Sequence, residues 1–114
     1  MNTRRVGSHG EDIAAAYLKK NGYKVLQRNF NCRFGEVDII ARDGDYIVFV
    51  EVKARADTSF GAPREAVDWH KQQRIIKCAN AWLTIKKQYG APVRFDVVEV
   101  LAGNVTLIRD AFRV

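Results

Sequence analysis

Ile47-Val48-Phe49-Val50-Glu51-Val52-Lys53 is an apolar run that ends in two charged residues. Its β-branched and aromatic residues predict a buried β-strand, because these side chains pack well on a pleated surface. Charged groups are rarely buried without partners, since removing an unpaired charge from water is costly. Glu51 and Lys53 therefore indicate a metal or phosphate site at the end of this strand.

A second carboxylate, Asp38, interrupts the preceding apolar run and can be placed by counting along a hairpin. Asp43-Gly44 is typical of a two-residue hairpin loop, and with this loop Asp38 lies opposite Phe49. Directly opposed residues share a face, and strand faces alternate with a period of two. Asp38 is then on the face of Glu51 and Lys53, diagonal to Glu51 at roughly 7–8 Å between backbones. Two carboxylates at this separation can bind one hard cation.

Turn and helix signals predict the remaining elements. Ser8 and Glu11 have the spacing of a capping box, which predicts a helix that starts there and stops at Gly22. Asp68 is expected to cap a long helix over residues 69–87, preceded by a short helix over residues 64–67. We expect strands over residues 23–29, 36–42, 46–54, 93–101 and 105–109. The order α-β-β-β-α-β-β, with the long helix as a crossover, predicts an α/β fold with a mixed sheet flanked by helices.

Two further glutamates are candidates for the same site. Glu11 begins the apolar stripe that runs to Leu18, so its side of the helix is expected to face the sheet. The capping box with Ser8 explains Glu11 without a functional role, and the two roles are compatible. Glu36 shares the face of Asp38 and is either a further ligand or an exposed residue at the start of its strand.

Chain length, net charge, apolar runs and cysteine spacing limit the classes of protein to which the chain can belong. The chain has 114 residues and a net charge of +6, which fits one domain over residues 1–114 that binds a polyanion such as nucleic acid. We find no apolar run that predicts a membrane span or signal peptide. Cys32 and Cys78 lack the spacing of a zinc or redox motif, which favours a reduced, cytoplasmic compartment. Asp96, in an apolar strand, is expected to make a buried hydrogen bond or salt bridge.

The Asp38 … Glu51-x-Lys53 pattern, on a hairpin behind a helix that bears Glu11, resembles the PD-(D/E)xK nuclease superfamily. Longer segments are similar to the YraN family: Gly10-Glu11-Asp12, Gly35-Glu36-Val37-Asp38-Ile39-Ile40-Ala41-Arg42-Asp43-Gly44, Phe49-Val50-Glu51-Val52-Lys53-Ala54-Arg55, Glu65-Ala66-Val67, Lys71-Gln72 and Arg94-Phe95-Asp96-Val97. The resemblance implies a restriction-endonuclease-like core, similar to Holliday-junction resolvases, and adds Glu11 to the site. It departs from the superfamily's nominal pattern at Val37, which stands in place of a proline that is often missing in the superfamily.

These observations predict a metal-dependent endonuclease that hydrolyses phosphodiester bonds, with structured or branched DNA as its expected substrate and Mg²⁺ or Mn²⁺ as its cofactor. The expected metal ligands are oxygen donors: Glu11, Asp38, Glu51 and the backbone carbonyl of Val52. Lys53 is expected to orient the attacking water or to neutralise charge on the phosphate. The side chains expected to contact flanking phosphates without reading sequence are Arg55, Lys71, Gln72 and Arg74.

Two other functions stay open. The chain is alternatively a catalytically inactive module that binds nucleic acid or serves as an adaptor. A further alternative is a protein-interaction domain in which Lys53 forms a structural ion pair with one of the two acids, Asp38 or Glu51. A homodimer is expected for a resolvase-like substrate, because a junction offers two symmetric cuts.

Overall fold

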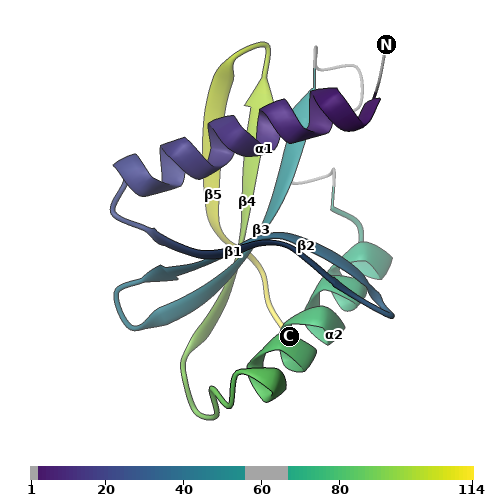
Figure 1. Ribbon diagram of the computed structural model, residues 1–114, viewed down its shortest axis with the longest axis vertical. Coiled ribbons are helices and arrows are strands. Elements are labelled where there is room, and N and C mark those ends of the chain that lie inside the picture. The colour runs from purple at the N-terminus through teal and green to yellow at the C-terminus, as the bar shows by residue number, and fades with distance from the viewer. Residues whose placement is uncertain (1–2, 56–66) are drawn as a thin grey trace.

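A five-stranded mixed sheet lies between two helices, α1 on one face and α2 on the other (Figure 1). The computed structural model describes residues 3–55 and 67–114, and only the backbone of residues 3–8. The elements are α1 Thr3–Lys20, β1 Lys24–Cys32, β2 Gly35–Asp43, β3 Tyr46–Arg55, α2 Trp69–Ile85, β4 Val93–Leu101 and β5 Asn104–Phe112. The strand order is β1-β2-β3-β4-β5. The predicted α/β class and element order are confirmed and are consistent with a restriction-endonuclease-like core.

The crossover through α2 makes β3 and β4 parallel, as predicted. The other neighbouring pairs are antiparallel. Asp68 caps α2 as predicted, and its side chain accepts a hydrogen bond from the backbone N–H of Lys71. Strands β1 and β5 each extend three residues beyond the predicted ends, because they continue to pair along their neighbours. The predicted short helix over residues 64–67 falls largely outside the described residues.

Helix α1 starts earlier than the sequence predicted. It begins at Thr3, so Ser8 lies within the helix and the predicted capping box with Glu11 is wrong. Residues spaced by three also neighbour one another inside a helix, so this spacing does not mark a helix start by itself. The predicted stop is confirmed, because Gly22 has a φ of +90° and its N–H donates to the carbonyl of Lys19.

The loop of the β2–β3 hairpin is Gly44-Asp45, one residue later than predicted. Ile39 pairs with Val50, so the register differs from the predicted one by two residues. A difference of two leaves every side chain on its predicted face, because faces alternate with a period of two. The neighbouring Asp38 therefore still shares a face with Glu51, and the two stand closer to direct opposition than the predicted diagonal.

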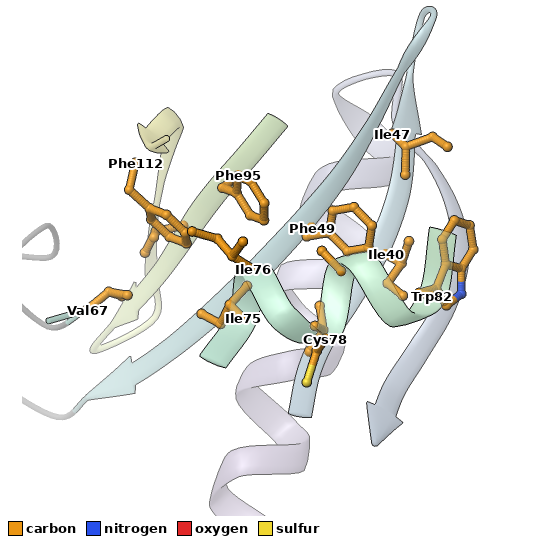
Figure 2. Close-up of a cluster of buried hydrophobic side chains, with 13 residues drawn as sticks. Ile40, Ile47, Phe49, Val67, Ile75, Ile76, Cys78, Trp82, Phe95 and Phe112 are labelled. Atoms are coloured by element: carbon orange, nitrogen blue, oxygen red, sulfur yellow. The ribbon is translucent and has the colours of Figure 1, made fainter. Parts of the chain in front are cut away.

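Each face of the sheet is buried against one helix. On the α2 face, the aromatic ring of Phe49 meets Trp82 edge-on at 5.9 Å and stacks on Phe95 at 5.8 Å (Figure 2). On the α1 face, Leu18 packs with valines of β3 and β4. Phe49 and Glu51 are successive residues of β3 on the α2 face, so the acidic residue comes directly after the apolar core. The fold therefore holds Glu51 on a rigid central strand.

A buried polar network closes the opposite end of β4. Asp96 is fully buried and accepts hydrogen bonds from the Tyr23 hydroxyl, from Arg94 Nε and from the backbone N–H of Asp110, each at 2.9 Å. Burial, followed by the charge of Asp96, raises the pKa of Tyr23 to about 12. The prediction that Asp96 has a structural role in a buried hydrogen bond or salt bridge is confirmed. None of the described helices has the length and apolar composition that a membrane span requires.

Candidate functional site

The predicted catalytic residues line one cavity of about 760 Å³. Its wall is formed by residues of α1, β1, β2, β3 and α2, so it lies where both helices meet the carboxyl end of β3. The charged residues that line it are Glu11, Glu36, Asp38, Glu51, Lys53 and Lys71. Four carboxylates and two ammonium groups thus gather in one cavity.

The carboxylates of Asp38 and Glu51 adjoin each other at the centre of this cavity. Asp38 Oδ2 accepts a 2.8 Å hydrogen bond from the backbone N–H of Val52, just beyond the last paired residues of β2 and β3. Glu51 is only 4% exposed. Burial, followed by the negative charge of Glu51, raises the pKa of Asp38 to about 8, although the bond from Val52 opposes the shift. The two acids therefore repel each other unless a positive charge lies close to both.

Two lysines supply positive charge at Glu51. Lys71 Nζ lies 2.6 Å from Glu51 Oε1, and Lys53 Nζ lies 3.7 Å from the same atom. Burial and the neighbouring Lys71 lower the pKa of Lys53. Burial also acts to lower the pKa of Lys71, but its contacts with Glu51 outweigh burial, and the pKa is raised. The face predicted for Lys53 and Glu51 is confirmed, and Lys71 reaches the same carboxylate from α2.

Glu11 lines the cavity but is held by β1. Its Oε1 accepts hydrogen bonds from Arg28 Nε at 2.8 Å and Asn29 Nδ2 at 3.0 Å. Across residues 3–55 and 67–114, no group of three or more His, Cys, Asp or Glu side chains is placed to hold a metal ion. The predicted three-carboxylate set of Glu11, Asp38 and Glu51 is therefore not assembled, because Arg28 and Asn29 engage the carboxylate of Glu11.

A glycine explains why α1 reaches this cavity at all. Gly10 is buried directly before Glu11, and a Cβ added to it would overlap the Cβ of Ala54. A residue without a side chain lets the helix backbone approach β3 this closely. Gly10 thus sets the position of Glu11 in the cavity wall.

The four residues predicted to contact phosphates lie in different surroundings. Arg55 forms an ion pair with Glu99, and its side chain is 9% exposed, so its guanidinium group is already engaged within the protein. Strand β3 continues to Arg55 and directs it toward Glu99 of β4, on the same face. The side chain of Gln72 is engaged by the backbone, because its Nε2 donates a hydrogen bond to the carbonyl of Val67 at 3.0 Å. Lys71 points into the cavity, and Arg74 is exposed beside it.

Several residues at the site were missed by sequence reasoning. Asn29 and Asn31 of β1 line the cavity, and Asn29 has a φ of 54°, a conformation that asparagine adopts more readily than most residues. Their spacing of two on a strand was the available signal. A disulfide joins Cys32 of β1 to Cys78 of α2, with the Cα atoms 6.1 Å apart. This bond was not predicted, because the spacing of the two cysteines in the sequence matches no redox motif.

The residues of this site lie within a region of the chain that matches one protein family. The model of a family described as uncharacterised protein family UPF0102 matches residues 10–100. A UPF0102 protein of Clostridium kluyveri is 46% identical and covers 96% of this chain and 94% of the relative. A UPF0102 protein of Caldanaerobacter subterraneus is 53% identical, with coverages of 88% and 82%. A third, of Rhodococcus opacus, is 46% identical, with coverages of 94% and 95%. None of these names states an activity.

Proposed function

The chain belongs to the uncharacterised protein family UPF0102, and we propose that it is a metal-dependent endonuclease that hydrolyses phosphodiester bonds in nucleic acid, with structured or branched DNA as its substrate. The observation that supports this most strongly is the pair of adjoining carboxylates, Asp38 and Glu51, beside Lys53 at the end of β3. This acid, acid-x-lysine arrangement on a hairpin resembles PD-(D/E)xK nucleases. The order of elements in the sheet agrees with that resemblance.

The donor chemistry of the cavity fits a hard divalent cation such as Mg²⁺ or Mn²⁺. Asp38 and Glu51 offer carboxylate oxygens, and their mutual repulsion is the kind that a shared cation relieves. With the backbone carbonyl of Val52, these two residues would hold the ion, and Glu11 would join them only after leaving Arg28. A cation held by these residues would supply polarisation of the scissile phosphate and a lower pKa of a bound water.

The side chains of the chain itself supply positioning and positive charge. Lys53 shares the face of Glu51 and is 24% exposed, so its ammonium group is accessible from the cavity. We assign it the stabilisation of charge on the phosphate oxygens or the orientation of the attacking water. Arg74 is exposed beside a smaller adjoining cavity of about 160 Å³, where it can contact a flanking phosphate.

Cleavage of branched, flapped and single-stranded DNA tests this proposal, with Mg²⁺ or Mn²⁺ and with a chelator. We expect metal-dependent cleavage by the wild type, reduced at least about 100-fold in Asp38→Asn, Glu51→Gln and Lys53→Met. Matched controls are Asp45→Asn in the exposed hairpin loop and Lys77→Met on the exposed side of α2, which should keep full activity. Equal cleavage by the site variants, or none by the wild type, contradicts the proposal.

The second candidate is binding of nucleic acid without catalysis. It is favoured by the engagement of Glu11 with Arg28 and Asn29, which keeps the third carboxylate away from the pair. In that case DNA binding needs no divalent cation and survives Glu51→Gln. A homodimer belongs to the first candidate, because a branched junction presents two symmetric cleavage sites.

A further inference from the structure

We infer that Lys71 is a built-in counter-ion of the site, which holds the Glu51 carboxylate and competes with a divalent cation for it. The inference rests on the proposed function, because it concerns the same pair of carboxylates. It assigns Lys71 a positioning role inside the cavity, in place of the flanking phosphate contact that the sequence predicted.

The contact between Lys71 and Glu51 is close and shielded from water. The 2.6 Å separation of Nζ and Oε1 is that of a charge-assisted hydrogen bond. The Glu51 side chain is 5% exposed and that of Lys71 is 31% exposed. Ion pairs on an open surface contribute little, whereas screening is weaker where water is displaced. A cation that approaches Glu51 therefore meets an oxygen that already carries a strong partner.

Helix α2 does not itself explain a lysine at this position. Lys71 lies in the first turn, and its backbone N–H donates to the N-cap side chain of Asp68 at 2.8 Å. A positive side chain at a helix N-terminus opposes the helix dipole, which favours anions there. The attraction between Lys71 and the neighbouring carboxylate of Glu51 outweighs this unfavourable interaction with the helix dipole. The lysine is therefore stabilised by the charge in the cavity and not by the helix.

A count of formal charges shows why Lys71 and a divalent cation compete. With a divalent cation bound, both acids would be ionised, and the two negative charges of Asp38 and Glu51 would balance the two positive charges of Lys53 and Lys71. A divalent cation would leave an excess of two positive charges in a largely buried space. Lys71 can relieve this excess, because its long stem starts from a different element than Glu51 and its ammonium group can turn away. The ammonium group then becomes available to a phosphate.

The test is calorimetric titration of the full chain with Mn²⁺ in the absence of nucleic acid. Lys71→Met removes the charge and keeps most of the stem, so we expect it to bind Mn²⁺ about tenfold more tightly than the wild type. Lys71→Arg keeps the charge and should bind no more tightly than the wild type. Lys77→Met makes the same change six residues later on the exposed side of α2, and its affinity should stay within about twofold of the wild type.

The outcomes separate this inference from the proposed function. A wild type that binds Mn²⁺ while Lys71→Met binds equally or less tightly overturns the inference and leaves the metal site standing. If Lys71 only stabilises the cavity, Lys71→Met should bind Mn²⁺ more weakly than the wild type, because the metal ligands would lose a contact that positions them. Failure of both proteins to bind Mn²⁺ overturns the inference and the metal-dependent function together. If Lys71→Met does not fold by circular dichroism, Lys71→Gln provides the same comparison.

Discussion

At the scale of single residues, the site depends on two acids that the fold forces together. Asp38 and Glu51 lie on one face because faces alternate with a period of two, and Glu51 is almost completely buried. Two close carboxylates cannot both ionise easily in such a place, so one of them holds its proton more strongly. The acid that shows this effect is Asp38, whose pKa is raised to about 8.

The raised pKa of Asp38 predicts the dependence of stability on pH. Because its pKa is 3.8 in the reference state and about 8 in the fold, the folded chain binds more protons than the unfolded chain between these values. The free energy of unfolding should therefore fall as pH rises through this range, by on the order of 1 kcal/mol per pH unit at most, and be highest toward its acidic end. Urea denaturation at pH 5 and pH 8, with a chelator present, measures this. Asp38→Asn should flatten the dependence and Asp45→Asn should keep it, whereas an unchanged slope in Asp38→Asn refutes the assignment.

The sequence allowed the two acids to be placed, but not all their partners. The hairpin loop was misplaced by one residue, yet the resulting register error of two preserved the face of Asp38. Lys71 was assigned to a flanking phosphate, because nothing in its sequence neighbours shows that α2 brings it to Glu51. The ion pair of Arg55 was not predicted for the same reason, since its partner Glu99 comes from a strand 44 residues later.

At the scale of elements, the site depends on how two helices dock on opposite faces of one sheet. Helix α1 approaches β3 at Gly10, and α2 is fixed by its apolar stripe and by the disulfide to β1. Strand β4 was predicted to the residue, because its apolar run is bounded by Pro92 and Gly103. The start of α1 was not predicted correctly, because the residues before Ser8 carry no apolar periodicity that distinguishes helix from coil.

The Cys32–Cys78 disulfide predicts a loss of stability on reduction. It joins residues 46 apart in sequence, and a bond across a loop of this length restricts the unfolded chain strongly. We expect reduction to lower the free energy of unfolding by about 2–4 kcal/mol in urea denaturation. The double variant Cys32→Ala, Cys78→Ala should be insensitive to reductant. Equal stability of the oxidised and reduced wild type would contradict the contribution assigned to this bond.

At the scale of the whole molecule, the net charge of +6 accompanies a local concentration of acids. The order of elements and the register of the sheet place Asp38 and Glu51 at one end of the central strand. An overall positive field attracts a polyanion, whereas the acidic cavity repels it unless cations intervene. Among the residues that the structure describes, the positive side chains that line the two cavities beside the pair of acids are Lys53, Lys71 and Arg74.

Binding of duplex DNA should therefore depend steeply on salt. In the absence of metal Lys71 stays paired with Glu51. With two phosphate contacts, from Lys53 and Arg74, the logarithm of the binding constant should fall with the logarithm of salt concentration with a slope of about −2. Fluorescence anisotropy in a chelating buffer, where cleavage is suppressed, gives this slope. Arg74→Ala should reduce its magnitude by about one, and Lys77→Met should not. An absence of binding at low salt, or an unchanged slope in Arg74→Ala, would exclude this mode of binding.

A crystal grown with saturating Mn²⁺ shows whether Asp38 and Glu51 bind a divalent cation. We expect an anomalous scattering peak between the two carboxylates, with the ammonium group of Lys71 moved away from Glu51 Oε1. No peak between them, with Lys71 still bonded to Glu51, would contradict the metal site and with it the proposed nuclease.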